Sequence, residues 1–144
     1  MSDLQLVWFR NDLRTRDNVA LSEAARVGPV VCVYCFCPEQ FVAHDVGGNR
    51  VAFTLAHLQS LATELEELGM ALRILELSDF SAVPEALAEL ARDLEVRGLW
   101  FNAEYPLNEQ RRDEAVEARF EEAGISVTRC TDGLIRAPGT VLTG

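Results

Sequence analysis

The sequence predicts an α/β fold built on a doubly wound, five-stranded parallel sheet flanked by helices. Short apolar runs alternate with amphipathic segments from one end of the chain to the other, which is the pattern of strands joined by right-handed helical crossovers. The run Pro29–Cys37 is apolar almost throughout, as expected of a parallel strand covered on both faces. No linker, repeat or low-complexity tract interrupts the 144 residues, so we expect one domain.

The elements of this Rossmann-like sheet follow one another in a regular order. Strands are expected at Leu4–Phe9, Pro29–Cys37, Ala71–Leu77, Gly98–Asn102 and Ile125–Cys130. Helices are expected from about residue 18 to 26, from about Arg50 to Leu68, at Val83–Glu95 and at Asn108–Ala123.

Local signals mark the ends of the first elements. Leu4–Phe9 is a short apolar run that ends in a polar cluster, as buried strands commonly do. Asp17 or Asn18 can cap the first helix, which runs to about Arg26. Val27–Gly28 then ends it, because glycine is favoured directly after a helix.

The later helices carry equally plain signals. The second helix is expected to bury one apolar stripe, made of Val51, Leu55, Leu58, Ala62 and Leu65. Gly69 ends this helix and Gly124 ends the fourth. Pro84 is compatible with the first turn of the third helix, where no backbone N–H donor is needed. The short apolar runs that lie between these helices are predicted to be strands.

Composition excludes several classes of protein. Hydrophobic residues make up 49% of the chain, which is too many for a disordered segment. The apolar runs are far shorter than a membrane span, and the acidic N-terminal segment lacks the basic region of a signal peptide. We therefore expect a cytoplasmic domain that does not contact a membrane.

The charge of the chain is strongly acidic. All 13 basic residues are arginines, and 23 acids bring the net charge to -10. The excess lies in residues 51–123, where solvated helix faces are the expected cause. Because such a surface repels phosphate, the domain is not expected to bind DNA unaided.

Three of the four cysteines lie in the second strand. Alternation along a strand places Cys35 and Cys37 on one face of the sheet and Cys32 on the other. They therefore cannot converge on a metal ion as the thiols of a turn can. We expect them to be small buried hydrophobic residues in a reducing compartment.

In doubly wound sheets, ligands bind beyond the carboxyl ends of the strands. The segments to consider are residues 10–18, 38–49, 102–108 and the tail after Cys130. The first loop lacks both GxGxxG and the P-loop pattern, and no serine or cysteine lies in a nucleophile elbow. Nicotinamide binding, P-loop nucleotide hydrolysis and a hydrolytic triad are therefore not indicated.

The first loop instead alternates charges of both signs. Arg10, Arg14 and Arg16 are interleaved with Asp12 and Asp17. Opposite charges at this density usually fix the geometry of a loop through bidentate ion pairs, and we expect that role here.

Three polar residues are candidates for binding a ligand at the same edge. His44 follows the second strand, and Asn108 and Glu109 open the fourth helix. Asn108 can equally be a helix cap, and Glu109 an acid favoured by the helix dipole. A carboxylate at this edge would also suit a flat heterocycle with adjacent N–H donors, as it suits a guanidinium fork.

Three segments carry a family resemblance. LVWFRNDLRTRDNVAL resembles the opening of the DNA photolyase and cryptochrome family, whose pattern is WFRxDLRxxDNxAL. YPLNEQRRD resembles the family's segment after the fourth strand, and APGTVLTG its link out of the first domain. The resemblance covers essentially the whole chain, but only the family's N-terminal domain. It implies an α/β domain at residues 1–130 and, at 131–144, the start of a linker toward an FAD-binding helical domain of a longer parent.

The resemblance also implies a light-harvesting cofactor, an antenna. In folate-type photolyases, which the chain resembles most, 5,10-methenyltetrahydrofolate lies between the two domains. The family's contacts to it fall on His44, Asn108 and Glu109, with the carboxylate accepting from the pterin ring. Other members use a deazaflavin or flavin antenna deeper in this domain, which residues 35–38 and Arg50 would approach.

By resemblance, the parent splits cyclobutane pyrimidine dimers in DNA under blue light. Reduced FAD donates an electron to the flipped-out dimer and regains it after the bonds break. The FAD and the damaged DNA would both be held by the other domain, so this chain is expected to be inactive alone. The alternatives are the same domain of a cryptochrome blue-light receptor or a stand-alone nucleotide-binding module, and the LNE segment argues against the latter.

Overall fold

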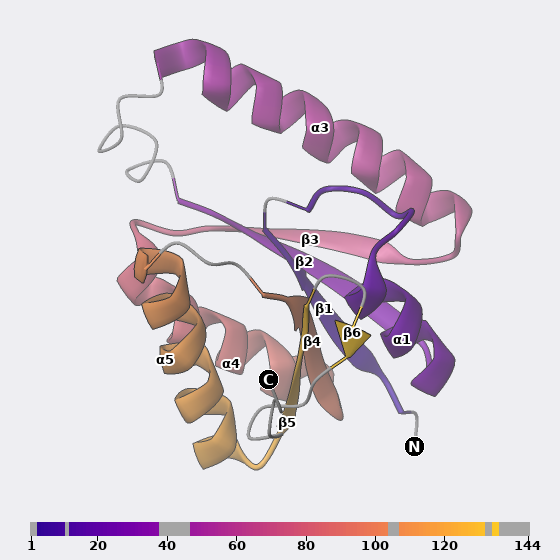
Figure 1. Cartoon of the computed structure of the whole chain (residues 1–144), viewed down its shortest axis with the longest axis vertical. Helices are drawn as coiled ribbons and strands as arrows, with labels where there is room; N and C mark the ends of the chain where they lie inside the picture. Colours follow the sequence, from indigo (N-terminus) through magenta and orange to yellow (C-terminus); the bar gives the residue numbers. More distant parts are fainter. Residues whose placement is uncertain (1–2, 11, 38–46, 104–106, 132–133, 136–144) are drawn as a thin grey trace.

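A computed structural model describes residues 3–10, 12–37, 47–103, 107–131 and 134–135 (Figure 1). At residues 47–51, 107–109, 131 and 134–135 it describes the backbone alone. The elements are β1 (Gln5–Phe9), α1 (Val19–Val27), β2 (Val30–Phe36), α3 (Gly47–Glu67), β3 (Ala71–Glu76), the 3-10 helix η1 (Phe80–Ala82), α4 (Val83–Leu94), β4 (Gly98–Asn102), α5 (Leu107–Ala123), β5 (Ser126–Thr131) and β6 (Leu134–Ile135).

The sheet has the strand order β3-β2-β1-β4-β5-β6 within the described ranges. The first five strands pair in parallel, which confirms the predicted doubly wound fold. The short β6 adds an antiparallel edge to β5, so the sheet continues into the segment assigned to a linker. Two residues carry no periodic pattern, and no sequence signal marked this strand.

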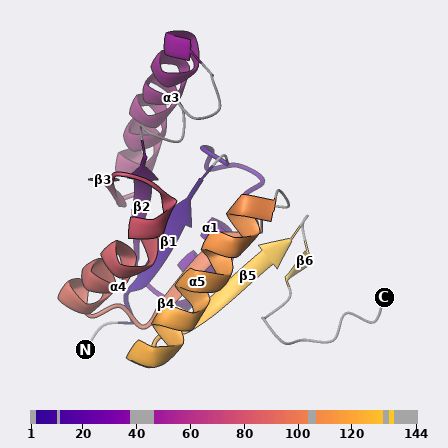
Figure 2. The same cartoon turned by 90° about the vertical axis from the view of Figure 1, so that its left-hand side faces the viewer.

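Helices cover both faces of the sheet, as Figures 1 and 2 show. On one face α4 and α5 pack over Leu6 and Trp8 of β1. On the other, α1 and α3 pack over Val7 and Phe9, the alternate residues of the same strand. The cysteines follow the predicted alternation, with Cys35 and Cys37 on the α4–α5 face and Cys32 on the α1–α3 face.

The predicted start and end of α1 are confirmed. Of the two candidate caps, Asn18 is the one used, and its side chain accepts a hydrogen bond from the backbone N–H of Leu21. Gly28 closes the helix, where a Cβ would overlap the backbone carbonyl of Asp3. Asn18 and Gly28 thus fix the two ends of α1, which connects β1 to β2.

The buried stripe predicted for α3 is only partly correct. Leu58 and Leu65 are buried together with Leu61, but Leu55 is 49% exposed. In Figure 2 the N-terminal half of α3 stands clear of the other helices, in agreement with the exposure of Leu55. The helix also begins at Gly47 and not near Arg50.

None of the helices in the described ranges is both long enough and apolar enough to cross a lipid bilayer.

Candidate functional site

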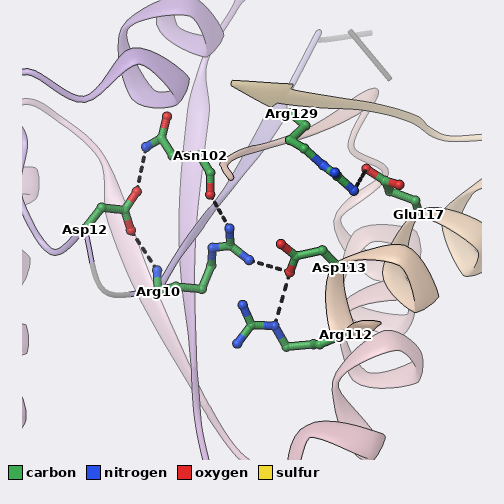
Figure 3. Close-up of polar contacts among 7 residues, drawn as sticks. All are labelled: Arg10, Asp12, Asn102, Arg112, Asp113, Glu117 and Arg129. Atoms are coloured by element: carbon green, nitrogen blue, oxygen red, sulfur yellow. Dashed lines mark hydrogen bonds and ion pairs between the residues drawn. The ribbon is translucent and has the colours of Figure 1, made fainter. Parts of the chain in front are cut away.

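The strand order reverses between β1 and β4, which is where doubly wound sheets bind ligands. Arg10 directly follows β1, Asn102 is the last residue of β4, and α5 begins five residues later. Figure 3 shows these residues joined in one polar cluster with Asp12 and Asp113. The topology therefore brings loops that are distant in the sequence to one edge of the sheet.

Arg10 lies at the centre of this cluster and is only 5% exposed. Its Nη1 donates to Oδ1 of Asp113 at 2.6 Å, and its Nη2 donates to the backbone carbonyl of Asn102. Its backbone N–H donates to the carboxylate of Asp12 at 2.9 Å. One side chain thus links the ends of two strands to the second turn of α5.

Asp113 is 1% exposed and also accepts from Nε of Arg112 at 3.2 Å. A charge removed from water to this extent is tolerated only with an ionic partner and good hydrogen bonds. The Arg10–Asp113 pair provides both, so each residue depends on the other for its burial.

Asn102 extends the network to α1. Its Nδ2 donates to Asp12 at 2.6 Å and to Oδ1 of Asn18 at 2.8 Å. Its Oδ1 accepts from the backbone N–H of Ala20 at 3.1 Å. The hydrogen bonds of Asn102 therefore connect the end of β4 to the first loop and to the start of α1.

Aromatic rings contact the two buried guanidinium groups. The Arg10 guanidinium carbon lies 4.5 Å from the ring centre of Trp8 and 4.6 Å from that of Phe101. The Arg112 carbon lies 5.0 Å from Trp8 and 4.6 Å from Phe80. These cation–π contacts partly replace the lost hydration of the arginines.

The predicted ion pairs within the first loop are wrong for Arg10 and Arg14. The carboxylate partner of Arg10 is Asp113, 103 residues away, and Arg14 donates to the backbone carbonyls of Arg16 and Asp17. The loop is fixed by hydrogen bonds between side chains and backbone groups, including those of Asp12 and Asn18, and by the ion pair of Arg10 with α5. Sequence reasoning missed Asp113 because it is one of many acidic residues in α5. The available signal was Arg10, a charged residue at the end of a buried strand, which needs a partner of opposite charge.

Of the predicted ligand-binding residues, His44 lies outside the described residues. Asn108 and Glu109 fall in the first turn of α5, where the backbone is described and the side chains are not. The helix begins at Leu107, so Asn108 is inside the helix and is not its cap. The first turn that carries both positions starts at the carboxyl edge of the sheet.

The thiols near this cluster have low reactivity. Burial raises the pKa of Cys35 to about 12 and that of Cys37 to about 11, with Arg112 opposing the shift in both. Both thiols are therefore protonated near neutral pH, which excludes them as nucleophiles. In the part of the chain that the structure describes, no three His, Cys, Asp or Glu residues gather as metal ligands.

Comparisons with known proteins agree in both sequence and structure. The family model "DNA photolyase" matches residues 5–144. The deoxyribodipyrimidine photo-lyase of Salmonella typhimurium is 40% identical over 141 residues, which cover 96% of this chain and 29% of that protein.

Two solved structures are also similar to the chain. A bacterial class III photolyase from Agrobacterium tumefaciens has a TM-score of 0.78 at 25% identity, over 91% of this chain and 26% of that one. A cryptochrome from Synechocystis sp. has a TM-score of 0.74 at 25% identity, over 91% of this chain and 27% of that one. The chain thus spans less than a third of each of these relatives.

Proposed function

Since the chain belongs to the DNA photolyase family, we propose that it is the antenna-binding N-terminal domain of a longer, light-driven DNA repair enzyme. The observation that carries this proposal is the extent of the match. The family model matches residues 5–144. The alignment with the Salmonella typhimurium deoxyribodipyrimidine photo-lyase covers only 29% of that protein. FAD binding, lesion binding and electron transfer are accordingly assigned to the rest of the parent.

The proposed antenna is 5,10-methenyltetrahydrofolate, held by His44, Asn108 and Glu109. The donor set fits this group, because a carboxylate and an amide can pair with the adjacent N–H and carbonyl groups of a pterin ring. The first turn of α5 also lies at the switch point, where such sheets bind ligands. When bound, the folate absorbs light and passes the excitation to the flavin.

The buried cluster supports an antenna at this edge of the sheet. Arg10 and Asp113 occupy the space beyond the ends of β1 and β4, and both are almost fully buried. A planar ligand at the switch point would therefore lie outside this cluster, against the first turn of α5. This supports the first turn of α5, which carries positions 108 and 109, as part of the proposed antenna site.

A deazaflavin or flavin antenna is the second candidate, and a separate observation favours it. In the N-terminal half of α3, Phe53 is 62% exposed and Leu55 49% exposed, and the Phe53 ring lies 4.2 Å from that of His57. Phe53 comes three residues after Arg50, so the two positions lie on the same side of the helix. Absorption spectra of the chromophore extracted from the parent distinguish a pterin from a flavin or deazaflavin.

Repair assays test the proposed activity. The full-length parent, loaded with FAD and irradiated with blue light, is expected to remove the lesion from an oligonucleotide that carries one cyclobutane pyrimidine dimer. The 144-residue chain is expected to leave the dimer intact under the same light. Chromatography of the digested oligonucleotide measures the outcome.

Two results would contradict this assignment. Dimer removal by the chain alone would show that it is more than an antenna domain. A parent that binds FAD and responds to light but leaves the dimer intact would favour a cryptochrome, an alternative supported by the likeness to the Synechocystis protein.

A further inference from the structure

The first turn of α5 carries two of the three proposed antenna ligands, Asn108 and Glu109, and one side chain contacts the chain on both sides of it, at the end of β4 and in the second turn of α5. The Nη2 of Arg10 donates to the backbone carbonyl of Asn102, where β4 ends. The Nη1 of the same side chain donates to Asp113 in α5 at 2.6 Å. Figure 3 shows the guanidinium group between the two acceptors.

We infer that Arg10 and Asp113 form a clamp that positions the antenna-binding turn of α5, an inference that rests on the proposed function. Arg10 directly follows β1, which lies between β2 and β4 in the sheet, so the clamp connects this turn to the interior of the sheet. Both residues are almost fully buried, so their hydrogen bonds are shielded from water.

Helix geometry makes position 113 suited to this task. It follows position 109 by four residues, which is about one turn, so the two positions share a face of the helix. Any rotation or shift of α5 at Asp113 is therefore transmitted to Glu109. A planar guanidinium group with several fixed donors can serve both acceptors, which a lysine ammonium cannot do with the same geometry.

A second ion pair on α5 provides a matched control. Glu117, one turn beyond Asp113, accepts from Nη2 of Arg129 at 2.7 Å and ties the helix to β5. If α5 needed only to be anchored to the sheet, loss of either pair would weaken antenna binding, with the smaller effect from Glu117–Arg129, whose side chains are 22% and 29% exposed against 2% and 4% for Asp113 and Arg10.

The first test measures amide hydrogen exchange in the full-length parent without antenna. The N–H groups of residues 111–114 donate to the carbonyls of residues 107–110 in an α-helix, so their exchange reports formation of the first turn. Asp113→Asn is expected to accelerate this exchange by about tenfold or more, the effect of losing a hydrogen bond to a charged group. Glu117→Gln is expected to leave it close to that of the unsubstituted protein.

The second test titrates methenyltetrahydrofolate into the same proteins. Asp113→Asn is expected to weaken folate binding by about tenfold or more and to shift the absorption maximum of the bound pterin, with FAD content unchanged. Arg10→Lys keeps the positive charge, so it serves as the second clamp variant if Asp113→Asn does not fold. It is expected to show the same weaker folate binding and the same shift of the absorption maximum. Glu117→Gln is expected to bind folate normally.

The outcomes separate this inference from the proposed function. Normal folate binding by both clamp variants, or equal losses in the Asp113 and Glu117 variants, would overturn the clamp while the antenna assignment stands. Failure of the unsubstituted parent to bind folate would overturn the antenna assignment and, with it, the role of the clamp.

Discussion

Individual charged residues determine the geometry of the carboxyl edge of the sheet. Arg10 and Asp113 are buried as a pair, and the aromatic rings of Trp8 and Phe101 contact the guanidinium group. Such a pair is costly to form but strongly destabilising to break, since removal of one partner leaves an unpaired buried charge. The geometry around it is accordingly well defined. Glu109, one turn before Asp113, is the residue on which the antenna proposal depends most.

Glu109→Ala in the full-length parent is expected to remove the folate absorbance while FAD is retained. Loss of a charged acceptor that faces buried N–H donors costs about 1–3 kcal/mol of binding free energy. Absorption spectroscopy of the purified protein measures both chromophores. Glu114→Ala is the control, because Glu114 is an exposed acid on the same helix. Full folate stoichiometry in the Glu109 variant would rule out the proposed contact.

Among the elements, α3 differs most from the other helices. Its C-terminal half packs on the sheet through Leu58, Leu61 and Leu65, whereas Phe53 and Leu55 in its N-terminal half are exposed. A single amphipathic helix thus has two environments. The packed half stabilises the domain. The exposed half is where a flavin antenna, the second candidate proposed above, would bind.

Leu61→Ala and Leu55→Ala should therefore have very different effects on stability. Leu61 is 1% exposed, and its truncation is expected to lower the free energy of unfolding by about 2–5 kcal/mol. Leu55→Ala is expected to change it by about 0.5 kcal/mol or less, as surface substitutions usually do. Urea unfolding at constant m-value measures both. Similar losses in the two variants would mean that the N-terminal half of α3 is packed as well.

At the scale of the whole molecule, the two apolar layers of the core each contain ionisable thiols. Burial raises the pKa of Cys32 on the α1–α3 face to about 12, and that of Cys35 on the opposite face to about 12, from 9.0. Cys37 and Cys130 are raised to about 11, also by burial. The folded protein keeps these protons where the unfolded chain loses them.

Alkaline pH is therefore expected to destabilise the domain. Below pH 9 the thiols are protonated in both states, so the stabilisation is fully present. As pH rises from about 9 toward 12, the unfolded state binds fewer protons than the folded state, and the free energy of unfolding falls. Urea unfolding across this range measures the loss. Cys32→Ala, compared with the unsubstituted chain, should show a shallower decline; an equal slope would contradict the assignment to the thiols.

The order of the strands and helices follows from local patterns in the sequence. Apolar runs at Gly98–Asn102 and Pro29–Cys37 predict β4 and β2 because burial on both faces requires continuous apolar residues. The cap of α1 could be narrowed to Asp17 or Asn18, because capping depends on only a few neighbouring residues, and the structure shows Asn18 in that role. The carboxyl edge could also be predicted as the site, since it follows from a parallel sheet.

The partners of the charged residues were decided by the tertiary structure alone. Arg10 was expected to pair within its own loop, yet its partner is Asp113 in α5, and the packing of α3 ends at Leu58, beyond which Leu55 is exposed. Local patterns describe what a residue requires, such as burial or an opposite charge. Which distant residue meets that requirement depends on where the chain brings α5 and the sheet together, and this is a property of the whole fold.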